Sequence, residues 1–168
     1  MRLVYPSKKY LKSYQEAFEE YSQHNITTYA FDDVNQIDVV KKCYDYRNGL
    51  NLKPNRVAQT TYWLVDGDKF IGEIGIRHTL NEFLLQYGGH IGYGVRYCCW
   101  GQGYGTKMLS LALKKAKRMG LSKVLVTCDS DNYASAKVIE NNNGKLENIV
   151  DNVIDGKPVQ TKRYWIEL

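Results

Sequence analysis

The chain has 168 residues, of which 43% are hydrophobic and 24% charged, and its formal net charge at pH 7 is +5. This length and composition exclude a disordered chain and predict one folded domain, residues 1–168, that needs no disulfide or metal to hold its core. No apolar run is long enough to span a bilayer and no signal-peptide pattern is present, so we expect a soluble, cytoplasmic protein without a membrane partner.

Two further classes of protein are disfavoured by the pattern of side chains. The basic residues are dispersed rather than gathered in arginine-rich runs, so a nucleic-acid-binding module is only a weak alternative. The three histidines are scattered, and the adjacent pair Cys98 and Cys99 has neither zinc-ligand nor thioredoxin spacing. We therefore expect reduced thiols and no bound metal.

The N-terminal half of the chain predicts two helices followed by a β-hairpin. Apolar residues at three- and four-residue steps indicate the helices, and Ser7 stands where an N-cap would begin the first of them. β-branched and aromatic runs on both sides of a Gly67 turn indicate the hairpin. The segments in chain order are a short opening strand, helices over 7–21 and about 38–47, strands over 56–65 and 69–80, and a loop over 81–87.

The C-terminal half predicts alternating strands and helices. One strand leads through a glycine-rich turn into a lysine-rich helix, which Gly120 ends. The segments in chain order are a strand over 88–97, a helix over about 103–119, a strand over 123–129, a helix over about 132–142, and strands over 144–150 and 161–168. The complete order, βααβββαβαββ, predicts an α/β fold with a central mixed β-sheet flanked by helices.

The glycine-rich turn, residues 101–106, is the most informative motif. The first N–H groups of a helix have no partner within the helix and lie at the positive end of its dipole, so this turn predicts an anion site. Trp100 stands where Walker A needs its first glycine, Thr106 replaces the lysine, and GxGxG is not the dinucleotide-binding GxGxxG. The alternative is that the glycines only make a tight turn.

The turn resembles the acetyl-CoA-binding turn of the GNAT N-acetyltransferases. The family pattern Arg/Gln-x-x-Gly-x-Gly/Ala falls on residues 100–105, with Trp100 in place of Arg or Gln, and Asn132 and Ser135 match the family's Asn-x-x-Ser/Ala pattern. The resemblance covers residues 57–168 well and the first third loosely. It implies a GNAT fold, use of acetyl-CoA as acetyl donor, and a pyrophosphate held by the backbone N–H groups of residues 102–106.

The resemblance also implies where the rest of the cofactor lies. In the family fold the strands over 88–97 and 123–129 splay apart, and the pantetheine arm pairs with backbone groups between them as an added strand. Arg96 and Lys107 are candidates to reach phosphates, although lone basic residues are commonly just solvated. The implied cofactor-binding residues are Tyr93, Gly94, Val95, Arg96, Gly101, Gln102, Gly103, Tyr104, Gly105, Thr106, Asn132 and Ser135.

Acetyl transfer to an amine needs a proton acceptor, because an alkyl amine is mostly protonated at neutral pH. The glutamate and tyrosine that some relatives use are replaced here by Thr127 and Ile139. Glu73, a carboxylate within an apolar strand, and His90 on the next strand are therefore the candidate catalytic residues. The alternatives are a solvent-facing Glu73, and for His90 a structural role.

Strand alternation refines the expectation for Glu73. It places Glu73 on one face with Ile71, Gly75 and Arg77, where small residues leave room for a substrate, with His90 as its neighbour or replacement. Weaker candidates are Tyr133 as an acid and the two adjacent cysteines as carriers of the acetyl group.

The expected acceptor is a small-molecule amine or an amino acid that attacks the thioester directly. A protein N-terminus or lysine is the alternative acceptor, a non-catalytic acyl-CoA sensor is the alternative function, and a homodimer is the assembly considered. The acidic residues expected to draw a cationic amine are Glu19, Glu20, Asp32 and Asp33.

Overall fold

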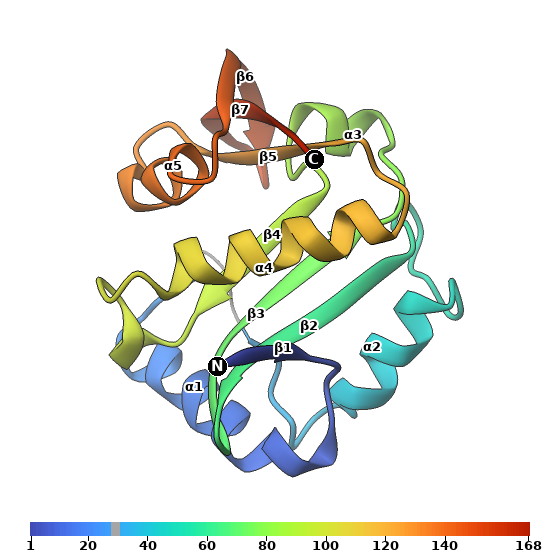
Figure 1. The fold of residues 1–168 in the computed structure, drawn as a ribbon, viewed down its shortest axis with the longest axis vertical. Helices are drawn as coiled ribbons and strands as arrows, with labels where there is room; N and C mark the ends of the chain where they lie inside the picture. The colour runs from blue at the N-terminus through green and yellow to red at the C-terminus, as the bar shows by residue number, and fades with distance from the viewer. Residues whose placement is uncertain (28–30) are drawn as a thin grey trace.

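The computed structural model describes residues 1–27 and 31–168, which form a mixed seven-stranded sheet with helices on both faces (Figure 1). The strand order is β1-β2-β3-β4-β5-β7-β6, and β4 and β5 are parallel whereas the other neighbours are antiparallel. The expected mixed sheet flanked by helices is confirmed. No helix among the described residues is both long and apolar enough to cross a membrane.

The bounds of most elements lie within four residues of the expected segments. The strands are β1 (Arg2–Val4), β2 (Gln59–Asp66), β3 (Lys69–Arg77), β4 (Ile91–Val95), β5 (Lys123–Asp129), β6 (Lys145–Ile154) and β7 (Lys157–Glu167). The helices are α1 (Leu11–Gln23), α2 (Val39–Arg47), α3 (Glu82–Gln86), α4 (Tyr104–Arg118) and α5 (Tyr133–Glu140), with 3-10 turns η1 (Lys8–Tyr10) and η2 (Tyr97–Cys99).

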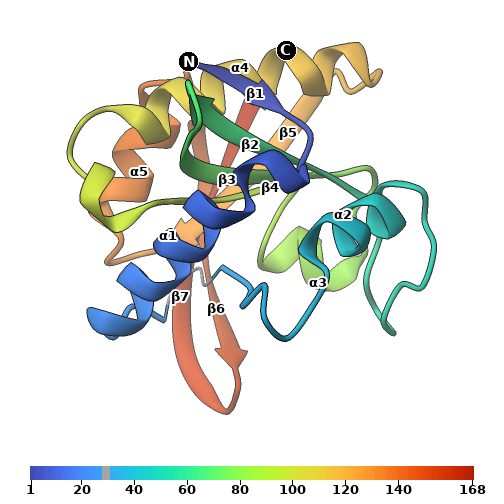
Figure 2. The same cartoon turned by 90° about the horizontal axis from the view of Figure 1, so that it is seen from below.

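The helices form two layers. Helices α4 and α5 cover one face of the sheet, and α1 and α2 cover the other (Figures 1 and 2). The core under α4 is mainly aliphatic, with Met108 and Leu109 fully buried. The core under α1 is mainly aromatic, and Tyr14 stacks on Trp63 with a centroid distance of 4.7 Å. Because both faces of the sheet are covered, the residues of β2 from Thr60 to Val65 are buried without a break, two threonines included.

Two local predictions were wrong. Residues 81–87, expected to be a loop, contain the short helix α3, which Asn81 caps by accepting the Leu84 N–H at 2.9 Å. Ser7 does not cap α1, because α1 begins at Leu11 and the 3-10 turn η1 lies between them. The hydroxyl of Ser7 makes no capping hydrogen bond. Both errors concern single turns, which are too short to show an apolar period.

A β-bulge in β3 changes which residues share a face. The register with β2 shifts next to Val65 and leaves Ile71 as the extra residue. Phe70 packs under α1, whereas Ile71 packs under α4. The prediction that Ile71 shares the face of Glu73 is therefore wrong, because the alternation restarts after the bulge.

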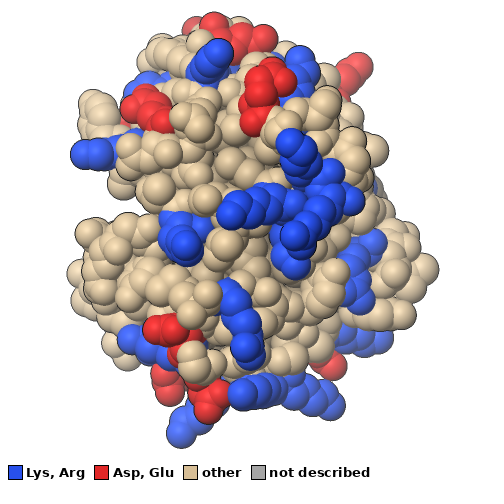
Figure 3. All heavy atoms as spheres, in the orientation of Figure 1, with Lys and Arg blue, Asp and Glu red and all other residues tan. Residues whose placement is uncertain are grey.

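Strands β4 and β5 meet at a single register pair, Ile91 with Val126, within the described part of the chain. From this pair the two strands diverge (Figure 1), and the sheet is open between the rest of β4 and the end of β5. The space-filling view shows the surface indented between α5 and the beginning of α4 (Figure 3). We call the place where β4 and β5 no longer pair the β4–β5 opening.

Candidate active site

The glycine turn connects η2 to α4 with two left-handed residues. Gly101 has φ +72° and Gly103 has φ +78°, a region that costs a residue with a side chain about 1–2 kcal/mol. The helix begins directly after Gly103, and the Lys107 N–H donates to the Gly103 C=O at 3.1 Å. The N–H groups of residues 104–106 precede this first helical bond, so they lie at the positive end of the α4 dipole.

Gly105 is small for a different reason. A Cβ at this helical position would lie 3.1 Å from Val138 Cγ2 of α5. Asn142, just beyond α5, also donates its side-chain N–H to the Thr106 C=O at 3.2 Å. These contacts hold α5 against the first turn of α4.

The start of α5 brings three of the expected cofactor-binding residues together. Asn132 Oδ1 accepts the Ser135 N–H at 3.0 Å, and the Ser135 hydroxyl lies 2.8 Å from the hydroxyl of Tyr93 on β4. The side chain of Asn132 is exposed. This group therefore lies across the β4–β5 opening, linking β4 to the helix that follows β5.

Basic side chains lie along the outer face of α4, with Lys107 in its first turn and the others in its C-terminal half. Figure 3 shows Lys and Arg gathered along the middle of this face. The positive potential of such a band favours an anionic ligand and does not select one. The exposed basic residues of α4 are Lys107, Lys114, Lys117 and Arg118.

The carbonyl of Val95 is already occupied. It accepts the Tyr21 hydroxyl at 2.7 Å and the Trp100 indole N–H at 2.7 Å. A carbonyl oxygen has two lone pairs, so this group has no capacity left for a pantetheine amide. This oxygen is therefore paired within the protein, and binding of the cofactor by Val95 stays a prediction that could involve only its other backbone group.

Arg96 is also unavailable to a ligand. Its side chain is only 8% exposed, and it forms ion pairs with Glu20 at 2.7 Å and Glu16 at 3.1 Å. Its N–H donates to the Ile71 C=O at 2.8 Å, and its C=O accepts the Cys99 N–H at 2.9 Å. The expectation that Arg96 binds cofactor is therefore corrected, because its guanidinium is neutralised and its backbone groups are paired.

Glu73 lies in the middle of β3 on the face that α1 covers. Its Oε2 accepts the Trp63 indole N–H at 2.8 Å. Burial, and then the charge of Glu73, raise the pKa of Tyr14 above its ordinary value, so a protonated phenol stands near the carboxylate. The neighbouring position on β4 is Gly94, which has no side chain to separate Glu73 from the β4–β5 opening.

His90 lies at the closed end of the same opening. It is 8% exposed, its Nδ1 accepts the Leu125 N–H at 2.9 Å, and its own N–H donates to the Leu125 C=O at 2.7 Å. Burial, and then the charge of Arg77, lower the pKa of His90 and keep the ring neutral. These contacts favour a structural role.

Glu73 and His90 are not neighbours. Glu73 is opposite Gly94, and His90 precedes Gly94 by four residues, which is about 13 Å along the strand. The prediction that His90 is the neighbour of Glu73 is therefore wrong, because the strand register separates them.

Asp129 is a candidate that the sequence analysis missed. It ends β5 on the side of the sheet opposite Cys128, which packs under α4, so it faces the same side as Glu73. Burial, and then the charge of Asp131, raise the pKa of Asp129 above its ordinary value. A carboxylate with a raised pKa beside an opening marks a functional candidate. The sequence signal is an acidic residue three positions before Asn132.

The other acidic candidates are less available. Glu20 is paired with Arg96, and Asp32 is paired with Lys42 at 2.7 Å. Asp33 Oδ1 accepts the Asn35 N–H at 2.9 Å, and Glu19 lies on the exposed surface of α1. Attraction of a cationic amine is therefore better assigned to carboxylates that border the opening.

The weaker candidates gain little support. Tyr133 is 75% exposed, with Lys162 over its ring. Burial, followed by the Cys98 thiol, raises the pKa of Cys99 to about 11, so this thiol is not a nucleophile at neutral pH. Cys98 Sγ lies 3.8 Å from Cys99 Sγ.

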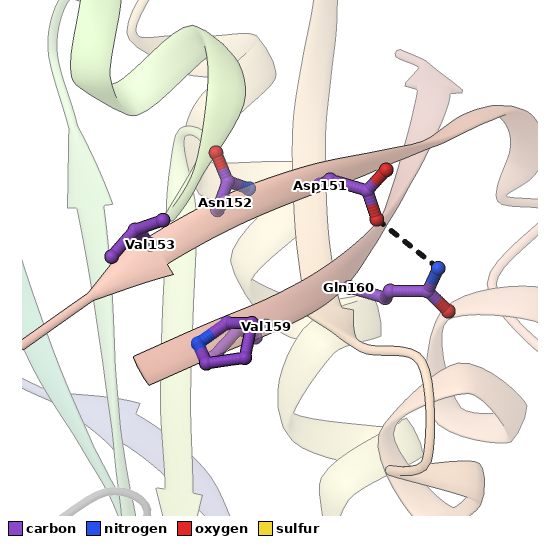
Figure 4. Close-up of a pocket in the computed structure, with 6 residues that line it drawn as sticks. Asp151, Asn152, Val153, Val159 and Gln160 are labelled. Carbon is purple, nitrogen blue, oxygen red and sulfur yellow. Dashed lines mark hydrogen bonds between the residues drawn. The ribbon is translucent and has the colours of Figure 1, made fainter. Parts of the chain in front are cut away.

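Two cavities lie away from the glycine turn. One of about 260 Å³ lies at the β6–β7 hairpin, where Gln160 donates to Asp151 at 3.1 Å (Figure 4). The other, of about 90 Å³, lies between α2, β2 and the segment after β1. Neither cavity is lined by an expected site residue. The candidate site therefore consists of the glycine turn, with its helix N–H groups, and the β4–β5 opening beside it.

Comparison with known families identifies the class of protein. The model of the acetyltransferase (GNAT) domain matches residues 11–145. The fold, the glycine turn and this match define the class, and the chain belongs to the GNAT acetyltransferase family. It is an N-acetyltransferase. No curated protein matched the sequence.

Solved structures show the same fold. The microcin C7 self immunity acetyltransferase MccE, in complex with acetyl-CoA and AMP, has a TM-score of 0.75 at 15% identity, covering 99% of this chain and 91% of that one. The ribosomal L7/L12 alpha-N-protein acetyltransferase RimL has a TM-score of 0.72 at 16% identity, covering 99% and 89%. A spermidine N-acetyltransferase SpeG chimera from Vibrio cholerae and hSSAT has a TM-score of 0.63 at 15% identity, covering 99% and 96%.

Proposed function

We propose that residues 1–168 form one domain that transfers an acetyl group from acetyl-CoA to a small amine or an amino acid. The observation that carries the proposal is the glycine turn, in which left-handed Gly101 and Gly103 precede the free N–H groups at the start of α4. Membership of the GNAT family supports it, as does the β4–β5 opening beside the turn.

Different residues of the chain bind different parts of acetyl-CoA. The N–H groups of residues 102–106 hold the pyrophosphate by charge and hydrogen bonding. Backbone groups of Tyr93 and Gly94 border the β4–β5 opening and pair with the pantetheine amides, and the exposed amide of Asn132 is the side-chain donor to the same arm. Acetyl-CoA, when bound, supplies the acetyl group as a thioester.

Glu73 is the proposed proton acceptor, directly or through a water. One of its carboxylate oxygens accepts the Trp63 indole N–H, and the position opposite it on β4 is Gly94, which leaves room beside it. Asp129 is the proposed partner of the ammonium form of the amine, because it ends the other strand that borders the opening and faces the same side of the sheet. Two carboxylates on this side favour a cationic acceptor.

A two-stage experiment tests the function. Calorimetry with CoA and with acetyl-CoA measures binding, and release of CoA is then measured with panels of cationic amines, amino acids, neutral amines and peptides. We expect micromolar binding and the fastest turnover with cationic small amines. Failure to bind either thioester or CoA would overturn the proposal. Binding without turnover would identify a sensor, and activity confined to peptides would overturn the acceptor class.

A further inference from the structure

Helix α1 presents a stripe of three residues to one buried arginine. Ser13, Glu16 and Glu20 are spaced by three and four residues, so their side chains lie on one face of the helix. Arg96 Nε donates to Glu20 at 2.7 Å, Nη2 donates to Glu16 at 3.1 Å, and Nη1 donates to the Ser13 hydroxyl at 3.0 Å. All three guanidinium nitrogens are therefore fixed to α1.

The same stripe reaches the backbone of the η2 turn. The second carboxylate oxygen of Glu20 accepts the Cys98 N–H at 3.2 Å. Although burial opposes it, hydrogen bonds from Arg96 and Cys98 hold the pKa of Glu20 below its ordinary value. Glu20 is thus a carboxylate at neutral pH, and it joins α1 to the segment that leads into the glycine turn.

Every residue from Val95 to Cys98 contacts α1 or its C-terminal end. The Val95 carbonyl accepts the Tyr21 hydroxyl, and the Tyr97 ring stacks on His24 with a centroid distance of 3.8 Å. The connection continues into the turn, because Gln102 donates its side-chain N–H to the Cys98 C=O at 3.0 Å. Contacts with α1 therefore hold the η2 segment, and through it the glycine turn, in place.

Packing alone does not explain a buried arginine at this place. Burying an ion pair costs desolvation free energy, and a well-packed apolar side chain of similar volume often stabilises a fold as well or better. A guanidinium held by three partners fixes direction as well as distance. It also neutralises the charge of two carboxylates, one of which, Glu20, bonds the η2 segment that leads into the glycine turn.

We propose that Arg96 is a positioning residue for acetyl-CoA: by tying the η2 segment to Ser13, Glu16 and Glu20 it pre-organises the glycine turn. The proposal rests on the proposed function, because it needs the turn to bind the pyrophosphate. Pre-organised groups lose less conformational entropy on binding, so the effect belongs to affinity rather than to the chemical step.

The experiment compares Arg96→Lys and Glu20→Gln with a matched control, Glu147→Gln. Glu147 likewise accepts a hydrogen bond from a largely buried arginine, Arg163, at 2.6 Å, but on the β6–β7 hairpin. For each variant, calorimetry gives the Kd of acetyl-CoA, steady-state kinetics give KM and kcat, and thermal unfolding gives Tm. We expect Arg96→Lys to raise Kd and KM for acetyl-CoA about tenfold, which is about 1.4 kcal/mol, with kcat nearly unchanged.

The outcomes separate three conclusions. Glu20→Gln is expected to raise the Kd several-fold, and Glu147→Gln is expected to leave it unchanged. Folded Arg96→Lys and Glu20→Gln proteins whose Kd stays within twofold of the wild type would overturn the positioning role, whatever their Tm. Wild-type protein that fails to bind acetyl-CoA would instead overturn the proposed function. If Arg96→Lys does not fold, Ser13→Ala removes one hydrogen bond to the guanidinium, and an unchanged Kd in that variant would also overturn the proposal.

Discussion

Replacing Gly103 by asparagine tests whether the glycine turn receives an anion. The residue has φ +78° and ψ 2°, and a Cβ built on it would have no atom within 4 Å. The free protein therefore has room for the side chain, and its cost is conformational. That cost is about 1–2 kcal/mol for alanine and less for asparagine, which tolerates the left-handed region. A side chain at this position is expected to keep a phosphate from approaching the turn.

The same helix provides a matched control at its other end. Gly120 has φ +89° and also has open space around a built Cβ. Asparagine at Gly103 and at Gly120 should therefore lower stability by similar amounts, below about 2 kcal/mol, or at most a few degrees in Tm for a chain of this size. Only the Gly103 variant should lose acetyl-CoA affinity, by tenfold or more, which is about 1.4 kcal/mol.

Calorimetric titration of acetyl-CoA into each folded variant measures the difference. Thermal unfolding without ligand shows whether the two substitutions cost the same stability. Equal acetyl-CoA affinity in Gly103→Asn, Gly120→Asn and wild type would refute the assignment of the turn as the pyrophosphate site. Equal losses in both variants would show that the effect comes through stability.

Three other variants test the side chains around the opening. Glu73→Gln keeps an oxygen for the Trp63 N–H but removes the proton acceptor, so kcat/KM should fall about a hundredfold near pH 7 and recover as pH approaches the amine's pKa; normal turnover would exclude Glu73. Asp129→Asn should raise Tm at pH 7, because it removes a half-buried charge. This gain in Tm should vanish as pH falls through the raised pKa of folded Asp129 toward the ordinary value of 3.8. A gain that does not change with pH would contradict the raised pKa. For His90, whose folded pKa is lowered, stability should be fully present above about 6.5 and decline below it, because protonation makes Nδ1 a donor facing the Leu125 N–H; an identical decline in His90→Asn would assign the titration to another group.

The sequence predicts those features that depend on residues close together in the chain. The strand over 123–129 was predicted with the bounds it has, because β-branched residues alternate there between two turn signals. The hairpin around Gly67 was also predicted correctly. The bulge at Ile71 was not predicted, because it depends on how β2 and β3 pair and no pattern within either strand indicates it.

In the candidate site, too, local features could be predicted from the sequence and long-range contacts could not. Gly101 and Gly103 have positive φ values, which glycine adopts more readily than other residues, so closely spaced glycines are themselves a local sign of such a turn. The contacts of Arg96 could not be foreseen, because its partners on α1 lie 76 to 83 residues earlier in the chain. The raised pKa of Asp129 was equally hidden, because burial depends on the packing around it. Long-range contacts thus decide which polar side chains remain available to a ligand.

Among the described residues, β4 and β5 share one register pair, so a rotation of one strand relative to the other would pivot at that pair. Val95 lies four residues beyond the joint at Ile91, which is about 13 Å, so a rotation of about 5° there moves it by about 1 Å. The joint is tightly built: a Cβ on Gly89 would clash with the Leu125 carbonyl, and His90 bonds the same residue twice. A substitution at Gly89 or His90 that rotates β4 is therefore expected to move Val95 more than Ile91. It would change the distance between the open ends of β4 and β5, and so the fit of a ligand between them.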